Sequence, residues 1–237
     1  MKKNKYLYNP IYSTGRNMRI RINGEKKEIR SNSQHIVIVE SQKFGKILVI
    51  DNVVQCAEKD HEIYDKAILE PLSKKDKKIL LLGAGSGYVA SLAIKKNPKI
   101  KIIIVDLDSE VVKMSKKFLG QKVFERKNVK LFIKDAIKYL EEAVRKKSFF
   151  CGIICDLTDT PIGAVEGTEF KKFYEKIILL SQKCLRDDGW MSIQAGAAKV
   201  SGKYVNGVHI IDKILKKEEF KNIFRKDVMV PSFGEKN

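Results

Sequence analysis

From residue 77 onward, short apolar runs alternate with segments of helical periodicity, and this alternation limits the possible folds most. Continuous apolar strands separated by helices are typical of a parallel sheet covered by helices on both faces. In such sheets, ligands bind beyond the carboxyl ends of the strands. We expect strands at residues 79–82, 102–105, 129–133, 149–155 and 190–194, and helices at residues 88–96, 109–119, 136–146 and 168–185.

The first 70 or so residues have a different pattern. Polar and apolar residues alternate within 19–22, 35–39 and 46–50, and Asp51-Asn52 form a turn before Val53-Val54. Such runs predict a small antiparallel meander. A helix is expected over residues 60–69, ended by Pro71. We therefore predict a β-rich domain with a connecting helix, residues 1–72, followed by an α/β domain, residues 73–237.

Composition limits the possible partners. The 237 residues carry a formal net charge of +18, which raises nucleic acid as a partner. The charge lies mostly in lysine doublets without interleaved aromatic residues, so we expect a solvated basic surface and no specific nucleic-acid binding. A membrane helix needs roughly 18 uninterrupted apolar residues, and the sequence contains no such run. Its basic N-terminus does not lead into the apolar h-region of a secretory signal. We therefore expect a cytoplasmic protein. The four cysteines lack metal-ligand spacing, so no metal site is predicted.

A glycine-rich turn follows the first strand of the expected parallel sheet. Residues 83–87, Gly-Ala-Gly-Ser-Gly, permit close approach of a ligand to the backbone. Asp106 lies about 20 residues on, where an acid can bind both ribose hydroxyls. This G-x-G-x-G form favours an S-adenosyl ligand over a dinucleotide and indicates a Rossmann-like nucleoside-binding domain; the alternative is a tight turn with a chance acid. Asp135 is expected to contact adenine, to cap the helix at 136–146, or both.

Two acids follow the apolar run 153–155. Residues 156–163 read Asp-Leu-Thr-Asp-Thr-Pro-Ile-Gly, and Pro161 and Gly163 keep this loop from becoming a helix. Alone, the motif is typical of a polar turn. Beyond a later strand of a nucleoside-binding sheet, however, Asp156 and Asp159 can hold a cationic amine and remove its proton.

Together these features resemble the polyamine aminopropyltransferases, the spermidine and spermine synthases. The resemblance runs from about residue 31 to residue 233. Four stretches carry it: 34–36 (Gln-His-Ile), 44–55 (Phe-Gly-Lys-Ile-Leu-Val-Ile-Asp-Asn-Val-Val-Gln), 58–64 (Glu-Lys-Asp leading to Tyr) and 156–159 (Asp-Leu-Thr-Asp). The second is the most specific, because a plain methyltransferase would not carry that hairpin. The last looks more like the spermine synthases.

The resemblance implies a mechanism and a set of site residues. The donor would be decarboxylated S-adenosylmethionine, the acceptor a polyamine or diamine, and no metal or other cofactor would be needed; a homodimer or homotetramer is implied. Asp156 would be the general base, and residues 157–167 a closing lid. Donor binding is implied for Gln34, Gly83, Gly85, Ser86, Asp106, Asp135 and Ala136, and acceptor binding for Tyr64, Asp65, Asp159, Gln194 and Phe233.

Three departures from the family pattern bear on the substrate. Ser86 stands where the family usually has an acid that holds the donor's amine, and Asp65 replaces a glutamine or histidine, which suggests a carboxylate moved across the cleft. Phe233 stands where tyrosine is usual in the family. The chain also stops before a further strand that related proteins generally have, which raises the question of a truncated C-terminus. Two alternatives remain: an enzyme using S-adenosylmethionine itself, as a methyltransferase does, and an idle binding or regulatory relative. His35 and His61 are expected to be packed or surface residues without chemistry.

Overall fold

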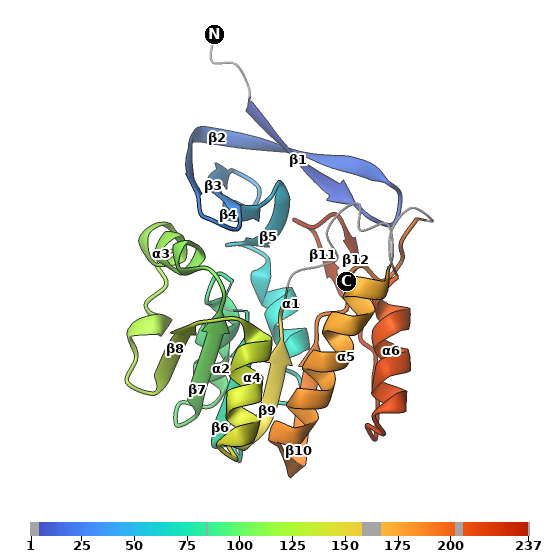
Figure 1. Cartoon of the computed structure of the whole chain (residues 1–237). Coiled ribbons are helices and arrows are strands. Elements are labelled where there is room, and N and C mark those ends of the chain that lie inside the picture. Colours follow the sequence, from blue (N-terminus) through green and yellow to red (C-terminus); the bar gives the residue numbers. More distant parts are fainter. Residues whose placement is uncertain (1–4, 84, 158–166, 202–205, 237) are drawn as a thin grey trace.

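The computed structural model describes residues 5–83, 85–157, 167–201 and 206–236 (Figure 1). Its first part is a five-stranded antiparallel sheet in which each strand pairs with the next along the chain. The strands are β1 (Lys5–Ile11), β2 (Arg16–Arg30), β3 (His35–Ser41), β4 (Gly45–Ile50) and β5 (Val53–Ala57). Asp51 and Asn52, with φ of 48° and 67°, form the β4–β5 turn. Positive φ at both turn residues matches the twist of a hairpin, and the predicted meander is confirmed.

The N-terminal sheet is longer than the sequence pattern predicted. β1 was not predicted, and the alternating run 19–22 is only part of the 15-residue β2. Most β2 residues are exposed, so burial imposes no alternation on much of the strand. The side chains on one face of the sheet form a hydrophobic core of the N-terminal part. On the other face, Ile36, Ile38 and Leu48 pack against helix α3 (Ser109–Phe118). This contact holds the N-terminal sheet against the second part of the chain.

The second part is a parallel sheet of order β10-β9-β6-β7-β8. Its strands are β6 (Lys78–Leu82), β7 (Lys101–Asp106), β8 (Val129–Ile133), β9 (Phe150–Cys155) and β10 (Leu185–Ile193). All five predicted strands are present, although β10 begins five residues before the predicted 190–194. The chain runs outward from β6 in both directions, so β6 and β9 flank the position where such sheets open to bind ligands.

Helices cover both faces of the parallel sheet, as predicted. Ile79 and Leu81 of β6 pack toward α1 (His61–Ile68) and α2 (Tyr88–Lys96), whereas Leu80 and Leu82 face the opposite core. That second core includes α4 (Ala136–Arg145) and α5 (Gly167–Cys184). A short 3₁₀ turn, η1 (Val123–Glu125), precedes β8. The five helices α1 to α5 agree with the predicted ones to within one residue at each end, whereas η1 was not predicted.

The helix α1 lies between the two sheets (Figure 1). Ile68 at its end, with Leu69 and Leu72 beyond it, packs in the core around β6. The connecting helix is therefore part of the hydrophobic core of the parallel sheet. The domain boundary between residues 72 and 73 stays a prediction.

Two C-terminal elements were not predicted. Helix α6 (Gly207–Lys217) packs Ile211 and Ile214 against α5. A hairpin of two short strands follows, β11 (Met229–Val230) and β12 (Glu235–Lys236). Strands of two residues are too short to leave an alternating pattern. Within the described ranges, no helix is both long and apolar enough to cross a bilayer.

Candidate active site

A cavity of about 320 Å³ lies beyond the carboxyl ends of the parallel strands. Its wall comes from the N-terminal sheet, from α1, from the loops after β6, β7, β8 and β9, and from the C-terminal hairpin. Twelve of the thirteen predicted site residues line it: Gln34, Tyr64, Asp65, Gly83, Gly85, Ser86, Asp106, Asp135, Ala136, Asp156, Gln194 and Phe233. The thirteenth, Asp159, lies outside the described residues, as does most of the predicted lid at 157–167.

The glycine loop brings the ends of three strands together. A Cβ added at Gly83 would lie 2.0 Å from the backbone oxygen of Asp156, and the φ of Gly83 is 86°. The N–H of Gly83 donates to Val105 O (2.8 Å), and the N–H of Asp156 donates to Leu82 O (2.9 Å). Gly83 is therefore needed for close packing of two backbones. At Gly85, with φ of 46°, no atom lies within 4 Å of such a Cβ, so the loop is open where a ligand can approach.

Asp106 is held in place by the turn that follows β7. Its Oδ1 accepts the N–H of Asp108 (2.8 Å), and Asp108 in turn caps α3 by accepting the N–H of Glu110 (2.9 Å). The hydroxyl of Ser31 donates to Asp108, which links this turn to the N-terminal sheet. The strand end thus presents an oriented carboxylate to the cavity, as ribose binding requires.

Asp135 caps helix α4, as the sequence indicated. Its Oδ1 accepts the N–H of Lys138 at 2.9 Å. The residue also lines the cavity, beside Ala136. Its contact with adenine stays a prediction.

The carboxylate of Asp156 meets a tyrosine from α1. The hydroxyl of Tyr64 donates to Asp156 Oδ1 over 2.5 Å, and the ring of Tyr64 lies edge-on to Phe233, with centroids 6.4 Å apart. Three predicted site residues, separated by up to 169 positions (233 − 64), are therefore in one cluster. A carboxylate anchored in this way can accept a proton from a ligand in the cavity.

Two buried polar residues connect the C-terminal hairpin to this cluster. Asp60 accepts the N–H and the hydroxyl of Ser232, at 2.7 and 2.9 Å, and Asn9 donates to Phe233 O (3.0 Å). Asn9 Oδ1 also accepts the N–H of Val54 (2.8 Å). These bonds hold Phe233 at the cavity wall. Asn9 lines the cavity but was missed, because a single polar residue in a strand gives no sequence signal.

His61 also lines the cavity. Its ring stacks on Tyr88, with centroids 3.7 Å apart and planes at 11°, so the predicted packing role is correct. In addition, Nδ1 lies 2.5 Å from Asp65 Oδ2. Burial raises the pKa of Asp65, and the hydrogen bond from His61 opposes that rise. This pairing was not predicted, although the i, i+4 spacing of a histidine and an acid on a predicted helix is a signal for it.

The other lining residues on this side are less polar. Burial raises the pKa of the Cys56 thiol to about 12, so the thiol stays protonated at neutral pH. Among the residues that the structure describes, no three His, Cys, Asp or Glu side chains are grouped so that they could hold a metal ion.

The comparisons with known proteins match both parts of the chain. Residues 61–236 match the family model of the spermine/spermidine synthase domain, and residues 12–58 match that of the spermidine synthase tetramerisation domain. The chain belongs to the spermine/spermidine synthase family. The family resemblance inferred from the motifs is thereby confirmed.

Individual members of the family are similar over most of the chain. Polyamine aminopropyltransferase 1 of Hyperthermus butylicus is 33% identical over 210 residues, covering 86% of this chain and 70% of the relative. The polyamine aminopropyltransferase of Pyrobaculum calidifontis is 28% identical (91% and 74% covered), and that of Thermoanaerobacter sp. is 32% identical (73% and 61% covered). The chain thus spans 61–74% of the length of these curated relatives.

Solved spermidine synthases share the fold. The crystal structure of the enzyme from Thermotoga maritima has a TM-score of 0.77 and 20% identity, covering 98% of this chain and 76% of that one. A spermidine synthase in complex with the transition-state analogue AdoDATO also has a TM-score of 0.77, with 23% identity, covering 98% and 77%. The predicted fold, a Rossmann-like domain preceded by an antiparallel β-domain, is confirmed.

Proposed function

We propose that this chain transfers an aminopropyl group from decarboxylated S-adenosylmethionine to a diamine or polyamine and releases 5′-methylthioadenosine. The charge of the cavity carries the proposal. Its described lining contains four aspartates, Asp65, Asp106, Asp135 and Asp156, but only one lysine, Lys134, in a chain of net charge +18. A polycationic protein can bind a cationic amine only where its surface is locally acidic.

The nucleoside side of the cavity fits the donor. We assign donor binding to Gln34, to Gly83, Gly85 and Ser86 of the glycine loop, to the acids Asp106 and Asp135, and to Ala136. The carboxylate of Asp106 would accept from the ribose hydroxyls, and the open backbone at Gly85 allows the ligand to approach. Polyamine aminopropyltransferases among the relatives, and a spermidine synthase solved with a transition-state analogue, support this donor class.

The chemistry needs one base and an in-line arrangement. Asp156 accepts a proton from the acceptor's ammonium group, and the neutral amine attacks the propyl carbon bonded to the sulfonium. A C–N bond forms, the C–S bond breaks, and the sulfur leaves as the neutral thioether of 5′-methylthioadenosine. Tyr64, through its 2.5 Å bond, holds the base in position. We assign acceptor binding to Tyr64, Asp159, Gln194 and Phe233. Asp65, which the family resemblance placed with the acceptor, we assign instead to the amine of the donor.

A second candidate is an enzyme that uses S-adenosylmethionine itself, which Ser86 favours because the loop lacks an acid. Incubation with either donor and a panel of diamines and polyamines, followed by mass detection, distinguishes the two. We expect 5′-methylthioadenosine and an acceptor heavier by one aminopropyl group. Methylated amine with S-adenosylhomocysteine would support the second candidate, and binding without any product would support an idle relative.

The match of residues 12–58 to a tetramerisation domain suggests an oligomer. We propose a homodimer or homotetramer of this chain, which light scattering on the purified protein would test. Location in the cytoplasm stays a prediction from the sequence.

A further inference from the structure

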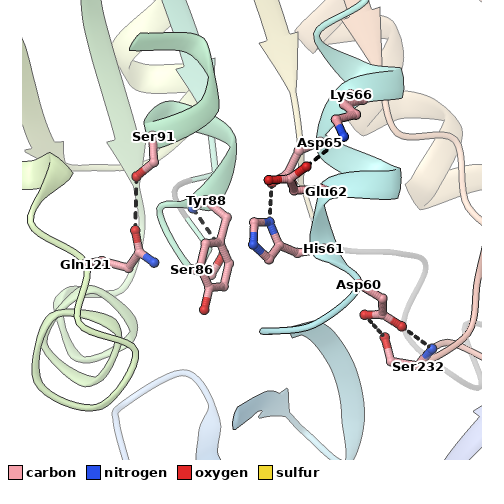
Figure 2. A network of polar contacts seen from close by, with 10 residues as sticks. All are labelled: Asp60, His61, Glu62, Asp65, Lys66, Ser86, Tyr88, Ser91, Gln121 and Ser232. Atoms are coloured by element: carbon pink, nitrogen blue, oxygen red, sulfur yellow. Dashed lines mark hydrogen bonds and ion pairs between the residues drawn. The ribbon is translucent and has the colours of Figure 1, made fainter. Parts of the chain in front are cut away.

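His61 and Asp65 of α1 line the cavity and belong to a polar network that reaches Tyr88 of α2 (Figure 2). His61 and Asp65 occupy successive turns of α1, and His61 Nδ1 lies 2.5 Å from Asp65 Oδ2. Only 2% of Asp65 is exposed. A carboxylate this buried requires a hydrogen-bond partner, and the histidine supplies it.

The His61–Asp65 pair lies against the glycine loop. The ring of His61 stacks on Tyr88, the residue that directly follows this loop. The N–H of Tyr88 donates to Ser86 Oγ (3.3 Å). The pair is therefore joined through one stacked ring to the position where the glycine loop carries serine.

One turn further along α2, Ser91 donates its hydroxyl to Gln121 Oε1 (3.0 Å; Figure 2). The ring of His61 is itself held at two places, by the stack on Tyr88 and by the contact of Nδ1 with Asp65.

The pair can carry a net negative charge in the cavity. When neutral His61 donates its Nδ1–H, Asp65 remains an ionised acceptor and the pair has a charge of −1. Burial alone raises the pKa of Asp65, and the bond from His61 lowers it, so loss of the histidine favours the neutral acid. His61 thus acts through Asp65 and is a positioning residue.

We propose, on the basis of the function proposed above, that His61 holds the Asp65 carboxylate as the anionic partner of the donor's cationic amine, in place of an acid in the glycine loop. Ser86 leaves that loop without a charge, and Asp65 supplies one from the adjacent helix. The same carboxylate repels S-adenosylmethionine, whose additional carboxylate would share this wall. His61 and Asp65 are therefore the residues that select the decarboxylated donor.

The test compares two ligands that differ by the amine. Decarboxylated S-adenosylmethionine carries it, whereas 5′-methylthioadenosine has the same nucleoside without it. Calorimetry at about pH 8 would use the full chain and three variants, Asp65→Asn, His61→Leu and His61→Gln. We expect the first two to weaken the decarboxylated donor about tenfold or more, the scale of a lost hydrogen bond to a charged group. Binding of 5′-methylthioadenosine should stay within about twofold, which also reports that each variant is folded.

Two variants separate positioning from mere packing. Gln at position 61 keeps a neutral N–H donor. His61→Gln should therefore retain most of the affinity for the decarboxylated donor that His61→Leu loses. Glu62→Gln is the matched control, since it removes a carboxylate from the same helix, where Glu62 pairs with Lys66 on the exposed face (2.6 Å; Figure 2). It should leave both affinities unchanged. The ratio of the affinities for decarboxylated S-adenosylmethionine and S-adenosylmethionine should fall in Asp65→Asn and stay unchanged in Glu62→Gln.

The inference is overturned if Asp65→Asn binds the decarboxylated donor as the wild type does, or if both ligands weaken equally. Turnover of the wild type in the same preparations separates this failure from failure of the proposed function. Aminopropyl transfer with an unaltered preference in the variants would refute only the roles of His61 and Asp65. Absence of transfer by the wild type would refute the function itself.

Discussion

At the residue scale, the most constrained group is a buried acid. Asp65 lines the cavity, is 2% exposed, and has a pKa raised by burial above its ordinary value of 3.8. At a pH between the ordinary pKa of the unfolded chain and the raised pKa of the folded protein, the folded state binds more protons than the unfolded state. The free energy of unfolding therefore falls as the pH rises through this interval. At a pH above this interval, the buried and ionised carboxylate lowers the stability of the protein. A role in binding a cationic ligand would explain why the chain has an acid at this position.

We predict that Asp65→Asn stabilises the protein at alkaline pH while weakening donor binding. The amide can still accept the N–H of His61 but carries no charge to desolvate. Thermal unfolding at about pH 8 should show a melting temperature raised by up to about 3 °C, the shift for about 1 kcal/mol in a chain of this size. The gain should shrink near pH 4, where the wild-type carboxyl is itself protonated. A larger gain in acid than in alkali would contradict the sign of the effect.

Residues that follow strands could be predicted, whereas those placed by tertiary contacts could not. Asp106 and Asp156 come directly after an apolar run, and Asp135 comes two residues after one. Because parallel strands end at one edge of the sheet, the sequence was enough to bring the three together. The environment of His61 depends on Tyr88, 27 positions away (88 − 61) in another helix. No local pattern reports such a contact.

At the scale of the element, the glycine loop joins sheet geometry to ligand access. Gly83 and Gly85 have positive φ, but their surroundings differ, since Gly83 faces the backbone of Asp156 and Gly85 faces open space. The strands around this loop were predicted well because they are buried on both sides and read as continuous apolar runs. The β2 strand and the C-terminal hairpin leave no such pattern, because they are largely exposed or very short.

We predict that alanine at these two glycines has different effects. In Gly83→Ala the new Cβ would meet the Asp156 oxygen at 2.0 Å, so β6 and β9 must separate and the melting temperature should fall by well over 5 °C. Gly85→Ala has room and should cost about 1–2 kcal/mol for its left-handed backbone. It should fold yet bind 5′-methylthioadenosine more weakly. Calorimetry and thermal unfolding check both, and equal stability of the two variants would contradict the assigned roles.

At the scale of the whole molecule, the cavity exists only because distant segments meet. The N-terminal sheet, the loops of the parallel sheet and the C-terminal hairpin all line it. Asp60 and Ser232 bond over 172 positions, and Asn9 and Phe233 over 224. The sequence motifs indicated which residues belong to the site, but the closing of its wall by the hairpin depends on these long-range bonds. An acidic cavity in a basic chain is thus a property of the complete fold.

The most direct measurement is single turnover by Asp156→Asn with decarboxylated S-adenosylmethionine and an accepted amine. We predict that 5′-methylthioadenosine forms at least about 10² times more slowly than in the wild type, the scale of a lost general base. The dissociation constant of that nucleoside should change less than about twofold. Tyr64→Phe, which removes only the hydroxyl that bonds Asp156, should reduce the rate less. Turnover equal to the wild type would show that Asp156 is not the base and would contradict the proposed mechanism.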